Sequence, residues 1–323
     1  MGLLQSDIFV ILAFLRHPRT PSSSSRSFVT LALLHHPRAP SSSSRKRGSH
    51  TIKKLCSLIL LKSSVCNGAC RSSELCRPDD AFWFGYKVKN VLHNLEKIQK
   101  NLLKVKADIT AAEKKYHRLP GSVVLVAVSK TQPHKNIKAA QTLGQIHFGE
   151  SYLQEALPKI AALAAISPNI IWHYIGRIQS KKTKLLALNF AWVETVTDFA
   201  TAELLNKYRP LSAPSLNICI QVNVDNSQSK SGVRIDDILP LAKKITLLPK
   251  LNLRGLMTIP NHQEKFEQQL AIFHTLFLEF KKLQQHGISV DTLSMGMSND
   301  FTAAIAAGAT MVRVGRTIFG ARP

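Results

Sequence analysis

Acidic residues are scarce in this chain. Lys and Arg number 43 against 20 Asp and Glu, which gives a formal net charge of +23, and residues 8–73 contain no Asp or Glu at all. Such an excess suits nucleic acids, acidic lipids or anionic small molecules as partners. After residue 85, however, the basic residues are spread through helical patterns and do not gather in one run with aromatics. We therefore expect a solvated basic surface and no nucleic-acid site.

Long hydrophobic runs are also missing. The apolar runs Ile8–Leu15 and Leu58–Leu61 are far too short to cross a bilayer, so we expect no membrane anchor. No coiled-coil pattern appears, which favours a monomer, although the long helix expected over Glu264–Gln285 could pair.

Cysteines are few, and their spacing predicts neither a disulfide framework nor a metal site. Four of the five lie in the first 85 residues: Cys56, Cys66, Cys70 and Cys76. The fifth, Cys219, stands alone in an apolar run, and we expect it to be a small core residue.

The first 85 residues do not have the pattern of a folded domain. LAFLRHPRTPSSSSR (12–26) recurs almost unchanged as LALLHHPRAPSSSSR (31–45). We expect a disordered basic extension over residues 1–85, preceding one folded domain over residues 86–323. The protein is then expected in the cytoplasm. The alternative is an organelle transit peptide, which such an Arg-rich, Ser-rich and acid-poor segment resembles.

From residue 86 onward, helical and strand patterns alternate. A helix is expected over Lys87–His117. Strands are expected over Val123–Val128, Gln145–Gly149, Ile170–Ile175, Trp192–Val196, Leu216–Val224, Leu253–Ile259, Thr292–Met295 and Met311–Val314, with helices between them and a short tail at the end. Eight strands with intervening helices predict an α/β fold, a (β/α)8 TIM-like barrel. An open doubly wound sheet is the alternative, but no G-x-G-x-x-G follows the first strand.

Sites in such barrels lie at the C-terminal ends of the strands. Lys130 follows the first strand, and desolvation there favours a neutral amine, which can form a Schiff base with an aldehyde. Ser298 follows the seventh strand, and Gly315 and Arg316 follow the eighth, where barrels of this type commonly bind phosphate. A nucleophilic lysine with a phosphate site suggests an aldehyde that carries a phosphate, such as pyridoxal 5′-phosphate (PLP) or a phosphorylated sugar.

Seven motifs in chain order carry a resemblance to a known family. They are AVSKTQP, HFGESYLQE, WHYIGRIQSKK, QVNVDNSQSKSG, RGLMTIP, SMGMSND and MVRVGRTIFGAR. Together they resemble the pyridoxal phosphate homeostasis proteins, whose wider relatives are the N-terminal barrels of alanine racemases. The resemblance covers about residues 86–323. It implies the barrel of PLP fold type III, without the C-terminal β-domain of alanine racemases.

The resemblance also implies roles for single residues. Lys130 would hold PLP through a reversible aldimine, and Ser298 with the backbone at Gly315 and Arg316 would bind the phosphate. Arg313 would face the pyridine nitrogen. Because an arginine stays protonated, that nitrogen would remain an acceptor and the ring a weaker electron sink. Ser151 stands where the family usually has Asn, and its shorter side chain weakens any direct contact made there.

The same resemblance implies a carrier rather than an enzyme. The protein would buffer, carry or deliver PLP in the cell, with apo PLP-dependent enzymes as recipients. A PLP-dependent racemase would need a second acid–base group, for which His173 and Tyr174 are conceivable, although a core histidine is the expected reading of His173. A Schiff-base aldolase acting on a sugar phosphate is a further alternative, and it would not need Arg313.

Overall fold

The computed structural model describes residues 78–225, 227 and 230–321. The tandem Ser-rich segments and the four cysteines Cys56, Cys66, Cys70 and Cys76 lie outside the described residues. The same holds for most of the extension expected over residues 1–85.

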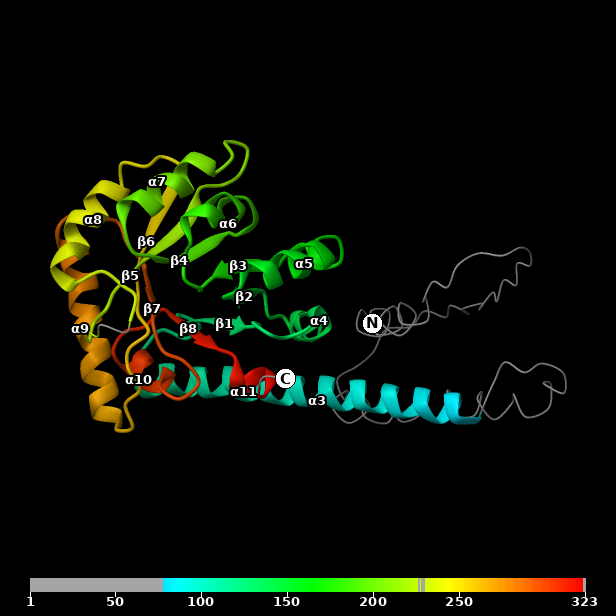
Figure 1. The fold of residues 1–323 in the computed structure, drawn as a ribbon. Coiled ribbons are helices and arrows are strands. Elements are labelled where there is room, and N and C mark those ends of the chain that lie inside the picture. The colour runs from blue at the N-terminus through cyan, green and yellow to red at the C-terminus, as the bar shows by residue number, and fades with distance from the viewer. Residues whose placement is uncertain (1–77, 226, 228–229, 322–323) are drawn as a thin grey trace, which may run out of the picture. The chain divides into compact units, whose positions relative to one another are not determined.

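Eight parallel strands close into a barrel in chain order (Figure 1). They are β1 (Val124–Val128), β2 (His147–Glu150), β3 (Ile171–Tyr174), β4 (Trp192–Val196), β5 (Leu216–Gln221), β6 (Leu251–Met257), β7 (Thr292–Ser294) and β8 (Met311–Val314). β1 pairs with β8 in the register Val124↔Met311 to Ala127↔Val314. This closing ladder confirms the predicted barrel and excludes the open doubly wound sheet, which would leave two free edges.

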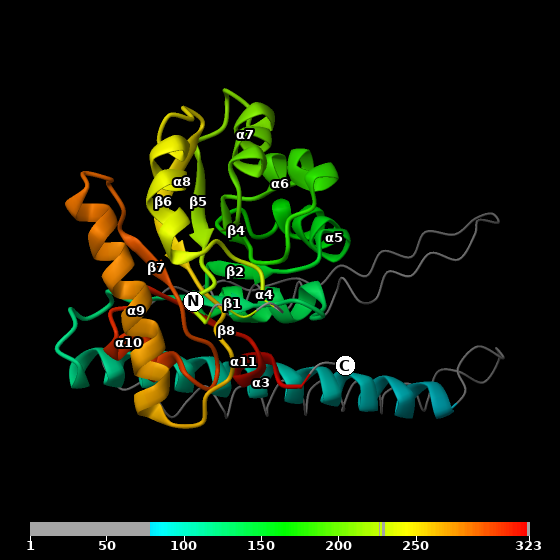
Figure 2. The same cartoon turned by 60° about the vertical axis from the view of Figure 1, so that its left-hand side comes forward.

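Helices surround the barrel. They are α3 (Pro78–Lys115), α4 (His134–Thr142), α5 (Leu153–Ala164), α6 (Thr183–Asn189), α7 (Phe199–Tyr208), α8 (Ile238–Ile245), α9 (Phe266–Gln285), α10 (Phe301–Ala306) and α11 (Arg316–Phe319), with 3-10 turns η2 (Ser180–Lys182) and η3 (Ile235–Asp237). In Figures 1 and 2, α3 is the long cyan helix that runs past α10 and α11. None of the helices that the structure describes has the length and apolar character needed to span a membrane.

Several ends differ from the expected ones, and two of these differences concern helices. α3 begins at Pro78 and not at Lys87, since proline is favoured in the first turn of a helix. The expected short tail instead contains the helix α11, because Gly315 permits a tight turn directly after β8.

The core has two layers separated by the barrel wall. Inside the barrel, Val126, Trp192, Cys219, Met257 and Met311 form one cluster. Leu125 and Ala127 of β1 belong instead to the larger cluster between strands and helices. Alternate residues of β1 therefore face opposite sides, as the strand period of two requires. The buried Cys219 confirms the expectation of a small core residue.

Candidate functional site

The predicted site residues gather at the C-terminal ends of four adjacent strands, β7, β8, β1 and β2. Lys130 follows β1, Ser151 follows β2, and Gly315 follows β8, which pairs with β1 on its other side. Ser298 lies in the loop after β7, next to β8. Lys130, Ser151, Ser298 and Gly315 are half-buried, Arg316 at the start of α11 is exposed, and Arg313 within β8 is only 3% exposed. Residues separated by up to 186 positions thus share one end of the barrel.

Lys130 sits in a turn between β1 and α4. The next residue, Thr131, has φ +64°, a left-handed conformation that is rare for a β-branched side chain. The preceding residue, Ser129, is fully buried, and its N–H donates to the Gly149 carbonyl. Such strained backbone tends to occur at functional sites, where the surroundings must stabilise it.

A buried ionic cluster lies beside this turn, on the helix side of the barrel wall. We call it the Lys159 cluster; its members are Ser129, Glu150, Glu155 and Lys159. Lys159 Nζ donates to both carboxylate oxygens of Glu150, at 2.9 and 3.1 Å, and to Glu155. Ser129 Oγ donates to Glu150 Oε1 at 2.6 Å. Burial raises the pKa of Glu150, while the hydrogen bond from Ser129 and the charge of Lys159 oppose that shift.

Arg313 is fixed from two directions. Its Nη1 donates to Ser294 Oγ at 2.5 Å, and its Nη2 donates to the Thr258 carbonyl at 2.7 Å. Burial lowers the pKa of the Arg313 guanidinium, and the charge of Glu194 opposes this. Because the ordinary pKa of an arginine is far above neutrality, the group remains a cation that can only donate hydrogen bonds.

From Arg313 a line of hydrogen bonds crosses the barrel interior. We call it the interior chain; it runs Arg313, Ser294, Glu194, His173 and His147. Ser294 Oγ donates to Glu194 Oε2 at 2.6 Å, and Glu194 Oε1 lies 2.7 Å from His173 Nδ1. His173 Nε2 in turn lies 2.9 Å from His147 Nδ1. The chain connects the C-terminal end of β7 to the first residue of β2, at the opposite end of the barrel.

The interior chain shifts two pKa values. Burial alone would raise the pKa of Glu194, but the hydrogen bond from His173 and the charges of His173 and Arg313 bring it below its usual value. Burial, followed by repulsion from His173, lowers the pKa of His147 to about 4. A carboxylate is therefore kept ionised inside the barrel, where an unpaired charge would be costly.

The two candidate bases on β3 are both engaged elsewhere. His173 is fully buried and stacks on Trp192 with ring centroids 5.2 Å apart, so it is a core histidine as expected. Tyr174 packs edge-on against Phe190 in the helix-side layer, and its hydroxyl donates to the Arg177 carbonyl. Both residues are buried, His173 completely and Tyr174 to within 3%.

Tight backbone packing shapes the loops after β7 and β8. A Cβ on Gly315 would lie 2.8 Å from the Val128 carbonyl oxygen, so this glycine permits the close approach of the β8 end to β1. Gly296 has φ +92°, and a Cβ there would lie 2.6 Å from Ala304 Cβ. Met297 N–H donates to the Asp300 carboxylate, which orders the loop that carries Ser298.

Sequence reasoning missed Lys159, Glu155, Glu194, Ser294 and Thr258 as parts of the site. One signal was available: Glu194 interrupts the apolar strand WVETV, and a charge within a buried strand requires a partner. The burial of Lys159 was harder to predict, because a lysine on an amphipathic helix normally faces solvent. In the part of the chain that the structure describes, no group of His, Cys, Asp or Glu is arranged to hold a metal ion.

Comparison with known proteins gives a consistent family. Residues 88–323 match the alanine racemase N-terminal domain. The chain is 45% identical over 230 residues to the pyridoxal phosphate homeostasis protein of Vibrio alginolyticus, covering 71% of this chain and 99% of that protein. It is 42% identical over 226 residues to the protein of the same name from Escherichia coli K12, covering 70% and 97%.

Solved structures agree with this assignment. PipY of Synechococcus elongatus PCC7942, solved with PLP bound, has a TM-score of 0.61 and 32% identity over 69% of this chain and 100% of its own. Alanine racemase of Corynebacterium glutamicum has a TM-score of 0.52 at 17% identity, over 71% of this chain and 62% of its own, and shows the shared fold alone.

Proposed function

Because this chain belongs to the pyridoxal phosphate homeostasis proteins, within the alanine racemase N-terminal domain family, we propose that it binds PLP and buffers, carries or delivers it. The observation that carries the proposal is the barrel it shares with PipY, which was solved with PLP bound. Lys130, which follows β1, supports the proposal, since a lysine amine can form a Schiff base with the aldehyde of PLP.

The residues at this end of the barrel fit the chemistry of PLP. The cofactor presents an aldehyde, a phosphate and a ring nitrogen. Lys130 supplies an amine, while Ser298 and the backbone N–H groups at Gly315 and Arg316 would supply donors for the phosphate. The buried guanidinium of Arg313 would supply a donor for the ring nitrogen. A phosphorylated sugar has no ring nitrogen, so its binding would not require Arg313.

When bound, PLP supplies an electrophilic aldehyde and a conjugated ring that can withdraw electrons. The residues of this chain would limit the second property. Arg313 is a permanent cation fixed to Ser294 and Thr258, so it can donate a hydrogen bond but not a proton. An unprotonated ring nitrogen weakens the ring as an electron sink, which suits storage of the cofactor better than turnover of an amino acid.

The surroundings of β3 also favour a carrier. Racemisation needs acid–base groups on both faces of the substrate carbon. His173 is bonded to Glu194 and His147, and the Tyr174 hydroxyl is bonded to Arg177. A carrier would release PLP to apo PLP-dependent enzymes. We propose a monomer as the working form.

The test is an absorbance spectrum of the purified full chain with PLP, followed by borohydride reduction and peptide mass mapping. We expect a pyridoxyl group on Lys130, which is lost in Lys130→Ala but retained in Lys135→Ala, a control at an exposed lysine of α4. A protein that takes up no PLP, with Lys130 unmodified, would overturn the proposal. Exchange of an amino-acid α-proton that disappears in Lys130→Ala would instead indicate the racemase-like enzyme.

A further inference from the structure

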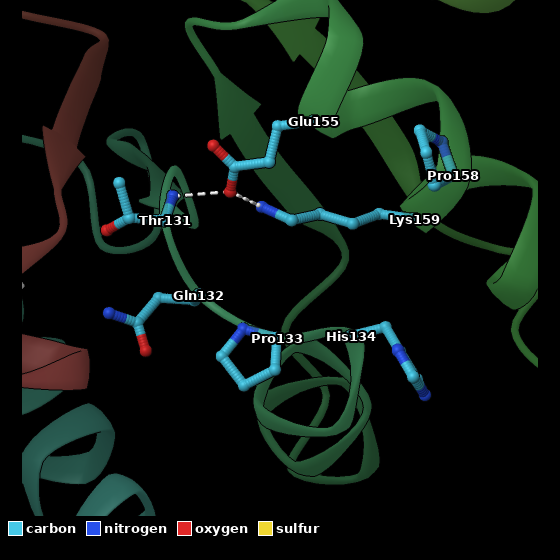
Figure 3. A pocket seen from close by; sticks show the side chains of 7 residues that line it. All are labelled: Thr131, Gln132, Pro133, His134, Glu155, Pro158 and Lys159. Carbon is cyan, nitrogen blue, oxygen red and sulfur yellow. Dashed lines mark hydrogen bonds and ion pairs between the residues drawn. The ribbon is translucent and has the colours of Figure 1, made fainter. Parts of the chain in front are cut away.

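The two peptide groups that flank Lys130 are both bound by the same buried cluster. On the N-terminal side, the Ser129 carbonyl accepts a hydrogen bond from Lys159 Nζ at 2.8 Å. On the C-terminal side, the Thr131 N–H donates to Glu155 Oε1 at 2.5 Å. Lys159 Nζ donates to that same Glu155 oxygen, which closes the arrangement (Figure 3). Fixing both peptide planes fixes φ and ψ of Lys130, and with them the direction in which its side chain leaves the backbone.

The turn needs such support because Thr131 is strained. Its φ of +64° lies in the left-handed region, which a β-branched residue rarely adopts. Its buried Oγ1 has no hydrogen-bond partner within the described residues, so its own hydroxyl does not compensate. The strained conformation persists only if its surroundings stabilise it. The Thr131 N–H bond to Glu155 is one contact that does so, beside the Gln132 N–H, which donates to the Ser129 carbonyl at 3.0 Å.

The supporting pair belongs to one helix. Glu155 and Lys159 lie four residues apart on α5 and therefore face the same side. The Lys159 side chain is 8% exposed and also contacts Glu150, whose side chain is fully buried. An ion pair this deep in the protein is expensive to desolvate, so it adds little net stability by itself. The pair also contacts the backbone on both sides of Lys130, and these contacts hold the turn in place.

We infer that Glu155 and Lys159 are positioning residues for Lys130. They keep its amine aimed at the position of the aldehyde, although neither residue need touch the ligand. The inference rests on the proposed function and adds to it. Glu155 borders an open cavity of about 530 Å³ that is also lined by Gln132, Pro133 and His134 (Figure 3), so the pair can be altered without opening the barrel core.

The test compares two variants of the pair with a matched control. In Glu155→Ala and in Lys159→Met, the Lys130 turn loses one of its two side-chain supports. The control is Glu113→Ala. Glu113 is also buried, and it accepts the backbone N–H groups of Gly121 and Val123 before the opposite end of β1. All three variants lose buried hydrogen bonds, but only the first two touch the peptide groups of Lys130.

Two rates are measured on the full chain, together with the melting temperature. One is the rate at which PLP and borohydride label Lys130, read by peptide mass. The other is the rate at which trinitrobenzenesulfonate labels Lys130 without cofactor. We expect Glu155→Ala and Lys159→Met to slow the PLP labelling by roughly tenfold to a hundredfold, the range that misplaced reacting groups produce. We expect Glu113→Ala to lower the melting temperature and leave both rates within about twofold of the unaltered chain, since it does not displace Lys130.

A second substitution at Glu155 distinguishes loss of the hydrogen bond from loss of folding. Glu155→Gln keeps a side-chain oxygen that can accept the Thr131 N–H, so it is expected to retain more of the labelling rate than Glu155→Ala. The inference is overturned if the Glu155 and Lys159 variants label Lys130 as fast as Glu113→Ala does. If the unaltered chain takes up no PLP, the proposed function fails instead. The rates of labelling by trinitrobenzenesulfonate then decide whether the pair positions Lys130. Equal rates in Glu155→Ala, Lys159→Met and Glu113→Ala would overturn the inference.

Discussion

A single carboxylate, Glu194, joins the two halves of the interior chain. It accepts from Ser294 on the Arg313 side and bonds to His173 on the other side. Glu194→Gln replaces one acceptor oxygen by an NH2 group and leaves a buried partner unpaired. We expect the free energy of unfolding to fall by about 1.5–3 kcal/mol, the usual worth of a hydrogen bond to a charged group.

Urea denaturation measures this loss. The control is Glu203→Gln at an exposed position of α7, which is expected to change stability very little. The affinity for PLP should also fall in Glu194→Gln, because Ser294 then holds Arg313 less firmly. If Glu194→Gln left the urea concentration at the unfolding midpoint unchanged, the carboxylate of Glu194 would not be needed for stability.

Another residue of the interior chain, His147, makes stability depend on pH. Its folded pKa is about 4, below the ordinary 6.5, because of burial and the neighbouring His173, while Glu194 opposes the shift. As the pH falls below about 6.5, the unfolded chain binds a proton that the folded chain does not. The free energy of unfolding should therefore decrease between about pH 7 and pH 5, where Glu194 stays ionised.

His147→Asn removes this titration. Urea denaturation at several pH values should then show a shallower fall in stability than in the unaltered chain. The two proteins differ only at residue 147, so the difference between their pH profiles reports the loss of the His147 imidazole. Parallel profiles would contradict the prediction.

At the level of helices and strands, the sequence predicted most of the barrel. β4 and β8 have the expected bounds, because their apolar runs mark them clearly. Other ends moved, as for β5, which ends at Gln221 and not at Val224. Val222 instead forms an isolated bridge with Val233, a contact between loops that hydrophobic periodicity does not reveal.

The loop between β7 and α10 depends on one glycine. Gly296 has φ +92°, and an added Cβ would lie 2.6 Å from Ala304 Cβ and 2.9 Å from Phe301 Cα. Gly296→Ala should therefore displace the loop that carries Ser298 and weaken binding of PLP. Gly287→Ala is the matched control: Gly287 also has a positive φ, but a Cβ there would meet no atom within 4 Å.

Both glycine variants should lose about 1 kcal/mol from backbone strain. Only Gly296→Ala is expected to lower the affinity for PLP, measured by titration of the absorbance band. Equal affinities in the two variants would indicate that the β7–α10 loop does not contact the cofactor.

At the level of the whole molecule, barrel closure creates what the sequence could not reveal. Ser294 and Glu194 lie 100 residues apart, yet their side chains bond. The strand ends could be predicted as a site because every strand of a parallel barrel points the same way. The partner of each polar side chain could not, since it depends on which residues face each other across the interior. Lys130 was therefore predictable, whereas its support by Glu155 and Lys159 was not.

The barrel and its site lie within residues 78–323, which leads to a last prediction. β1 pairs with β8 inside this range, and all the proposed PLP-binding residues fall between 130 and 316. A chain shortened to residues 78–323 should keep the melting temperature and PLP affinity of the full chain, measured by circular dichroism and absorbance titration. A chain shortened further, to residues 112–323, loses the buried Ile98, Leu102, Val105 and Ile109 of α3 and should not fold. Weaker PLP binding by the 78–323 chain would place part of the site before residue 78.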